Sequence, residues 1–165
     1  MKNNNKLLAF VSLILSLSVI FSGTSVYSET TFEKIKRTGK ATVGTEAAFP
    51  PFEFVEDGKI VGYGKDILDY IIADLGVELN QLDLPWQGIL PGVLAGKFDF
   101  VATSVSIRAE RAKKYAFTVP IAEGTNWVMK RSGDNSIMSP DDLSGKVVCT
   151  QLASGSEKAT KEWEA

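Results

Sequence analysis

The chain has 165 residues, of which 44% are hydrophobic and 23% charged, and its formal net charge is −2, with one cysteine and no histidine. A lone cysteine excludes an internal disulfide, and the lack of histidine removes the commonest residue of zinc sites and of acid–base catalysis. The sequence has no basic block and no basic–aromatic stripe, which argues against nucleic acid as a partner.

The first 28 residues differ in composition from the rest of the chain. Their only charges are Lys2 and Lys6, an apolar and serine-rich run follows at residues 7–21, and every acidic residue lies at Glu29 or beyond. The run is shorter than the roughly 20 residues of a membrane-spanning helix. We therefore predict a secretory signal peptide over residues 1–28, with a retained anchor as the alternative. No later run approaches spanning length, so the mature chain is predicted not to span the membrane.

The next hundred residues alternate between strand and helix patterns. Asp57-Gly58 is typical of a two-residue hairpin turn between residues 53–56 and 59–63, and residues 46–52 are expected to form a loop. Pro91 predicts an irregular entry near Trp86, with regular helix after Leu90. Helices are predicted over residues 32–37, 66–75, 86–95 and 107–115, and further strands over 41–45, 79–84 and 98–103.

The remaining residues follow a stretch, 120–126, that is the best candidate for a hinge. Strands are predicted over 126–130 and 146–150, the second of which would bury Cys149. A short helix is predicted over 141–143 and a last helix from residue 156 to 164. Alternating strands and helices indicate an α/β fold with a largely parallel sheet.

Four segments in register resemble one protein family. They are VGTEAAFPPFEFVEDGKIVGY at residues 43–63, WQGILPGVLAGKFDF at 86–100, SVSIRAERAKKYAFTVP at 104–120 and the weaker KVVCTQLASGSE at 146–157. The chain resembles the family 3 extracellular solute-binding proteins, which deliver amino acids to ABC importers. The resemblance implies a periplasmic-binding-protein-like fold of two α/β lobes. We expect lobe 1 over residues 29–123, nearly complete, and a partial lobe 2 over 124–165.

The resemblance places a ligand carboxylate at Arg111, whose guanidinium can form a bidentate, charge-assisted pair. Composition alone would make Arg111 a solvated helix residue. Ser104 aligns with a residue that faces the ligand's ammonium group. The Ser106 amide, at a predicted helix start, is a donor to an anion, and the Ser106 side chain is a predicted N-cap.

An aromatic pair, Phe49 and Trp86, aligns with the residues that enclose the ligand side chain. For Trp86, simple core packing is nearly as good an interpretation. Glu46 aligns with a position that is often acidic in members that bind basic side chains, although a solvated loop acid fits equally well.

In the second lobe, Ser154 and Gly155 match a turn whose backbone amides complete the carboxylate site. Gly155 stands where threonine is common, and Ala153 where glycine is usual. Gly64 also departs from the acidic residue common at its position.

These observations predict an exported, periplasmic or secreted protein that binds an amino acid, with a polar or basic side chain, for delivery to the membrane permease of an ABC importer. No cofactor or metal is expected. The alternatives are a periplasmic dehydratase-like enzyme on the same fold and a non-functional truncated fragment. Because the second lobe is short, we expect exposed apolar residues there, such as Trp127, Val128 and Trp163.

Overall fold

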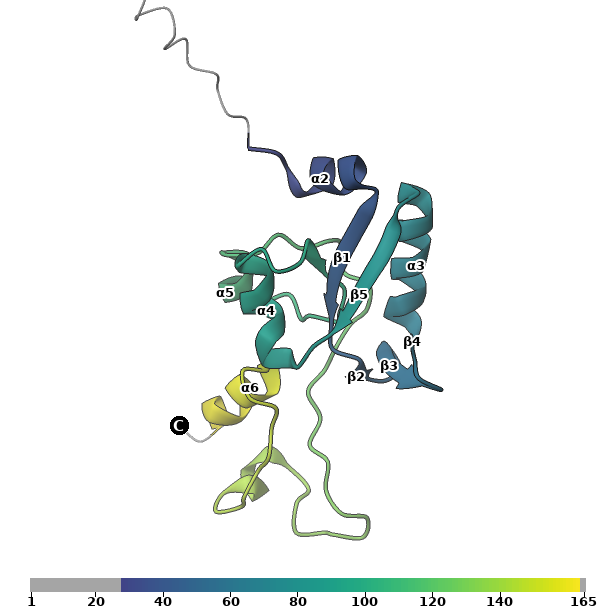
Figure 1. Cartoon of the computed structure of the whole chain (residues 1–165). Helices are drawn as coiled ribbons and strands as arrows, with labels where there is room; N and C mark the ends of the chain where they lie inside the picture. The colour runs from purple at the N-terminus through teal and green to yellow at the C-terminus, as the bar shows by residue number, and fades with distance from the viewer. Residues whose placement is uncertain (1–27, 164–165) are drawn as a thin grey trace, which may run out of the picture. The chain divides into compact units, whose positions relative to one another are not determined.

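The computed structural model describes residues 28–163, drawn in colour in Figure 1. The predicted signal peptide, apart from Ser28, lies outside the described residues. The chain divides between Lys34 and Ile35 into two compact units, residues 1–34 and 35–165. Within residues 28–163, no helix combines the length and the apolar character needed to cross a membrane.

In the first unit, the described residues contain the start of helix α2 (Thr31–Thr38). The Glu33 carboxylate accepts hydrogen bonds from the Thr30 amide at 2.8 Å and the Thr30 hydroxyl at 2.9 Å. The Glu33 amide donates in return to the Thr30 hydroxyl oxygen at 3.2 Å. This reciprocal arrangement is a capping box, which satisfies amides that the first helical turn leaves without a partner.

In the second unit, strand β1 (Lys40–Thr45) is the centre of a three-stranded sheet. It lies between β5 (Glu78–Asp83) and β6 (Phe100–Val101), and both pairings are parallel. Val43 of β1 is opposite Phe100 of β6. The parallel sheet confirms the predicted α/β class, although β6 is shorter than the strand predicted there.

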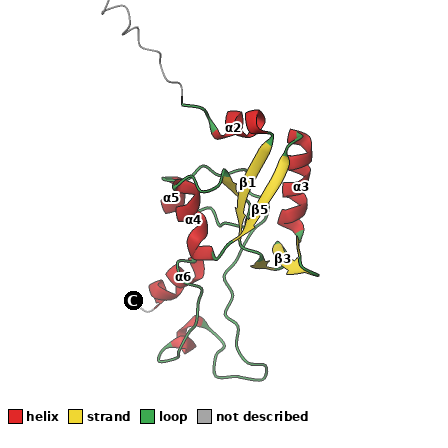
Figure 2. Cartoon of the chain, in the orientation of Figure 1, coloured by secondary structure: helices red, strands yellow, loops and turns green. Residues whose placement is uncertain are grey.

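Helices α3 (Tyr63–Leu75) and α4 (Trp86–Leu94) flank the β1–β5 pair on opposite sides (Figure 2). Both helices were predicted, but α3 begins at Tyr63, before the predicted start at residue 66. The N–H of Gly76 donates to the carbonyl oxygens of Ile72 and Ala73, and Gly76 has a φ of 65°. Glycine adopts this left-handed conformation without steric penalty, which explains why α3 ends here.

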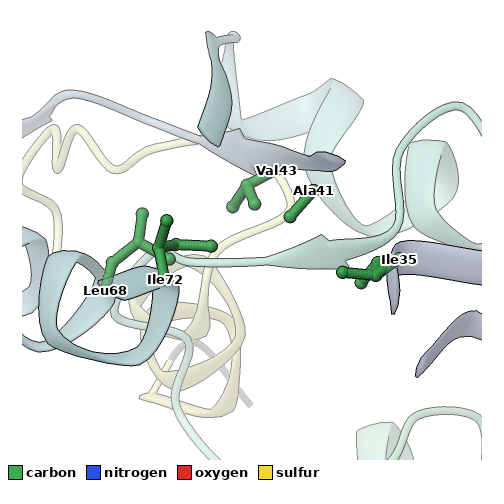
Figure 3. Packing of buried hydrophobic residues seen from close by; sticks show 5 residues of the cluster. All are labelled: Ile35, Ala41, Val43, Leu68 and Ile72. Atoms are coloured by element: carbon green, nitrogen blue, oxygen red, sulfur yellow. The ribbon is translucent and has the colours of Figure 1, made fainter. Parts of the chain in front are cut away.

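The alternation of side chains along β1 separates two packing regions. Ala41 and Val43 are buried on one face against Leu68 and Ile72 of α3 and Ile35 of α2 (Figure 3). These five residues form the core that holds α3 on the sheet.

On the other face of β1, the ring of Phe98 lies between two glycines. A β-carbon built on Gly44 or on Gly92 would lie 2.6 Å from the nearest atom of this ring. Phe98 and Ile89 of α4 are both buried. Both glycines are therefore needed for α4 to approach the sheet this closely.

The predicted irregular entry of α4 is wrong, because the helix is regular from Trp86 with Pro91 inside it. Proline lacks the amide that would donate to the carbonyl of Gln87, four residues earlier. Gln87 is exposed in the first turn, where water can replace that donor.

A second sheet is antiparallel, with β3 (Glu53–Glu56) between β2 (Ala48–Phe49) and β4 (Lys59–Val61). Asp57 and Gly58 both have positive φ, 49° and 74°, as the tightest hairpin turns require. The predicted hairpin is confirmed. The predicted loop before it is partly wrong, because it contains β2.

Beyond the sheets, the chain forms α5 (Ala109–Ala112), the 3-10 helix η2 (Pro140–Leu143) and α6 (Gly155–Trp163). The two later helices were predicted. The first is much shorter than predicted, because the backbone stays extended through Arg108, with φ −137° and ψ 147°.

The two strands predicted between hinge and last helix are wrong, because residues 126–130 and 146–150 contain no strand. An isolated extended segment leaves its backbone groups without ladder partners, so β propensity alone does not make a strand there. Cys149 is exposed rather than buried. Apolar exposure is confirmed for Trp127, at 86%, and for Val128 and Trp163.

Candidate functional site

Two loops meet where the parallel strands β1 and β6 end, which is the edge at which open α/β sheets bind ligands. The hydroxyl of Thr45 donates to the carbonyl oxygen of Ala102 at 2.8 Å, and the hydroxyl of Thr103 donates to the carbonyl oxygen of Glu46 at 3.5 Å. These bonds join the loop after β1 to the loop after β6. The predicted residues Glu46 and Ser104 are thereby held at one edge.

Glu53 of β3 is a buried carboxylate that sequence reasoning missed. It is 2% exposed and accepts hydrogen bonds from the Ser104 amide at 3.1 Å and the Ser104 hydroxyl at 2.9 Å. Burial raises the pKa of Glu53, and the hydrogen bonds from Ser104 offset only part of this rise. A β-carbon on Gly64 would lie 2.0 Å from Oε1 of Glu53, so the absence of a side chain at Gly64 makes room for the carboxylate.

Arg111 is positioned by two groups of neutral charge. Its guanidinium carbon lies 5.3 Å from the centroid of the Trp86 ring, and its Nη1 donates to the carbonyl oxygen of Ser106 at 3.1 Å. Trp86 is 9% exposed at the first turn of α4, so the ring is a fixed surface. Burial, followed by the charge of Arg108, lowers the pKa of Arg111.

The predicted N-cap role of Ser106 is wrong. Helix α5 begins at Ala109, its N-cap residue is Arg108, and no side chain caps it. Ser106 instead contributes its carbonyl oxygen to Arg111. Its role as an amide donor to a ligand stays a prediction.

The predicted aromatic pair has two different sets of neighbours. Phe49 is half exposed and stacks on Phe52, with ring centroids 5.6 Å apart and planes at 15°. Phe52 in turn meets Tyr63 edge to face at 6.1 Å. Trp86 contacts Arg111 instead. Enclosure of a ligand side chain by Phe49 and Trp86 therefore stays a prediction.

A cavity of about 640 Å³ brings three of the predicted residues together. Arg111 lines it from α5, and Ser154 and Gly155 line it from the start of α6. The hydroxyl oxygen of Ser154 accepts from the Glu157 amide at 3.1 Å and so caps α6. Ala153, which also lines the cavity, has a φ of 60°, a conformation that glycine adopts more easily.

Glu46 is linked to the same part of the chain by one bond. Its Oε1 accepts a hydrogen bond of 2.6 Å from Nε2 of Gln151. Gln151 lies three residues before Ser154, so this bond connects the loop after β1 with the turn that leads into α6.

Arg108 also lines the cavity, and sequence reasoning missed it. A β-carbon on Gly155 would lie 1.9 Å from Nη2 of Arg108, so the guanidinium occupies the space that a side chain would take. Its Nε is buried without a hydrogen-bond partner among the described residues. The one available signal was the glycine at 155, where threonine is common in the resemblance.

The cavity thus presents two guanidinium groups and the backbone of a helix start, a set that suits an anionic ligand. Across residues 28–163, no group of three or more histidine, cysteine, aspartate or glutamate residues is arranged to hold a metal ion.

Comparison of the sequence with known proteins identifies one family. The family model of bacterial extracellular solute-binding proteins, family 3, matches residues 41–163. The L-cystine-binding protein TcyJ of Escherichia coli (strain K12) is 33% identical over 150 residues, which are 90% of this chain and 55% of that protein. The chain spans about half the length of the curated relatives it matches.

Solved structures agree with the fold. The ancestral amino acid-binding protein AncCDT-1, a precursor of cyclohexadienyl dehydratase, matches with a TM-score of 0.75 and 34% identity, over 81% of this chain and 61% of that one. The arginine-bound form of domain 1 from TmArgBP matches with a TM-score of 0.51 and 42% identity, over 53% of this chain and 70% of that one. The fold is the α/β fold of periplasmic amino-acid-binding proteins, in part. The chain belongs to the bacterial extracellular solute-binding proteins of family 3.

Proposed function

We propose that this protein binds an amino acid in the cavity between α5 and α6 and delivers it to the permease of an ABC importer. The observation that carries the proposal is the placement of Arg111. The face of Trp86 and the carbonyl of Ser106 hold its guanidinium at a cavity that Ser154 and Gly155 also line. A held guanidinium loses less side-chain entropy when a ligand arrives.

In this proposal Arg111 binds the α-carboxylate. Only Nη1 donates to Ser106, so other N–H groups of the guanidinium are available for a carboxylate. The backbone amides of Gly155 and Ser156, at the start of α6, add donors to the same group, whereas the Ser154 amide donates to the carbonyl oxygen of Gln151 at 3.2 Å. Arg111 and the turn before α6 thus form the two sides of the carboxylate site.

The ammonium group of the ligand is assigned to Ser104. The Ser104 hydroxyl donates its hydrogen to Glu53, so its oxygen has lone pairs with which to accept from an ammonium. The negative charge that Glu53 carries when ionised favours a cation near this hydroxyl. Phe49, Trp86 and Glu46 are proposed to face the ligand side chain.

Two relatives support a role in ligand binding, and one of them is a single domain. TcyJ is named for cystine, and domain 1 of TmArgBP was solved in an arginine-bound form. We assign residues 29–123 to a first lobe and 124–165 to part of a second, with export through the predicted signal peptide to the periplasm or cell exterior.

We further propose that the ligand leaves unchanged. A dehydratase-like activity is the second candidate, because AncCDT-1 is a precursor of a dehydratase. The two candidate functions differ in the molecule that the protein releases after binding. Mass spectrometry of released ligand identifies the same amino acid for a binding protein and a dehydrated product for an enzyme.

The test is calorimetric titration of the purified protein against the common amino acids and cystine. Arg111→Ala removes the proposed carboxylate partner, and Arg131→Ala is the control because Arg131 is exposed and does not line the cavity. We expect at least one amino acid to bind to the wild type and to Arg131→Ala, with Arg111→Ala weakened by tenfold or more. Equal binding by Arg111→Ala contradicts the assignment of the carboxylate site.

A further inference from the structure

The cavity wall carries four basic side chains that differ in how they are paired. Lys158 pairs with Glu110 at 3.2 Å and Glu162 at 3.9 Å, and Lys161 pairs with Glu157 at 2.7 Å. All three of these carboxylates line the cavity, and each one has a lysine partner. The two arginines of the wall therefore have no carboxylate of their own among the described residues.

Arg108 is the less satisfied of the two arginines. Arg111 has a carbonyl and an aromatic face as partners, whereas the side chain of Arg108 forms no hydrogen bond or ion pair within residues 28–163. A buried guanidinium nitrogen without a partner destabilises the protein unless water or a ligand supplies an acceptor. Glu110 acts on both arginines through its charge, but its carboxylate oxygen is bonded to Lys158.

The two guanidinium groups lie against different neighbours. Arg111 lies over Trp86 of α4, while Arg108 lies against Gly155 at the start of α6. A single carboxylate on Arg111 thus leaves Arg108 for another acidic group. The volume of about 640 Å³ falls within the range of small-molecule sites, so it has room for more than an α-carboxylate.

We propose that Arg108 binds a second acidic group of the ligand, and that the site therefore takes amino acids with a side-chain carboxylate. The inference rests on the proposed function, because Arg111 is assigned to the α-carboxylate. It replaces both the expectation of a basic side chain and the assignment of Glu46 to the ligand side chain, since Glu46 does not line the cavity and its Oε1 accepts from Gln151.

The test compares isosteric pairs: calorimetric titration of the purified protein with L-glutamate against L-glutamine, and L-aspartate against L-asparagine. Each pair differs by one carboxylate, so its ratio isolates the second acidic group. Arg108→Gln removes the charge with little change of volume, and Arg131→Gln is the matched control. Urea denaturation of each variant verifies that it is folded.

We expect one acidic amino acid to bind the wild type about tenfold or more tightly than its amide. Arg108→Gln should remove this preference and keep the affinity for the amide within about twofold, whereas Arg131→Gln should keep the preference. An amide that binds the wild type as well as its acid overturns the inference without use of any variant, as does a preference that survives in Arg108→Gln. Binding of neutral or basic amino acids alone overturns the inference but leaves the proposed function standing. If no amino acid binds at all, both fail.

Discussion

Ser104 gives both of its donors, the backbone amide and the hydroxyl, to the carboxylate of Glu53, at 3.1 and 2.9 Å. The two residues are 51 positions apart, in the loop after β6 and in β3. Glu53 therefore links the loop after β6 to the hairpin. Glu53→Ala should lower the free energy of unfolding by about 1–3 kcal/mol, because both donors lose their acceptor. Urea denaturation measures the difference.

Glu53 also makes stability depend on pH. Its pKa in the folded protein is raised by burial above the value in the unfolded chain, so the folded state binds the proton more tightly. The contribution of this group to stability is complete below the unfolded pKa and is lost as the pH rises through the folded pKa. Between the unfolded and the folded pKa of Glu53, the denaturation midpoint should fall more steeply with pH in the wild type than in Glu53→Gln. Identical pH profiles would contradict the assignment.

The glycines of α4 are expected to differ in their tolerance of alanine. A β-carbon on Gly92 would lie 2.6 Å from the buried ring of Phe98, whereas one on Gly88 has nothing within 4 Å. Gly92→Ala should therefore destabilise the protein by about 1–3 kcal/mol through overpacking. Gly88→Ala, the matched control, should be neutral or stabilising by about 0.5–1 kcal/mol. Thermal denaturation of both variants tests this, and equal midpoints would contradict the packing of Phe98.

Local signals explain the parts of the fold that could be predicted. Asp57-Gly58 and Gly76 specify a turn and a helix end through their own backbone preferences, and the apolar spacing of Leu68 and Ile72 specifies the face of α3. Residues 126–130 and 146–150 have the β propensity of a strand but pair with no other strand. Their local sequence does not reveal that a partner strand is missing. Pairings between distant residues were therefore the part of the fold that sequence reasoning missed.

The candidate site follows the same division. Arg111, Ser154 and Gly155 could be predicted because a motif places them, and the cavity brings them together. Glu53 and Arg108 were missed because their significance depends on partners 51 and 47 residues away, Ser104 and Gly155. No spacing rule within one segment identifies such a pair.

Trp86 should report on ligand binding through its contact with Arg111. A carboxylate that pairs with the guanidinium changes the charge felt by the indole ring, so we expect the intrinsic fluorescence to change on saturation with an amino acid that binds. Trp86→Phe should abolish the change. Trp127→Phe, which alters a ring that is 86% exposed, should keep it. A signal that persists in Trp86→Phe would place the ligand away from this ring.

Gly155→Ala tests the contact with Arg108 from the opposite side. Its β-carbon would lie 1.9 Å from Nη2 of Arg108, and the guanidinium is the flexible end of a long side chain, so we expect it to move away from α6. The preference for an acidic amino acid over its amide should then fall by about as much as in Arg108→Gln. Calorimetry of Gly155→Ala, Arg108→Gln and the double variant measures the coupling between the two positions. Because the three atoms nearest to the added methyl all belong to Arg108, Gly155→Ala should change little further in the Arg108→Gln background. Effects that add in the double variant would mean that Gly155 acts on the ligand through the backbone of α6 and not through Arg108.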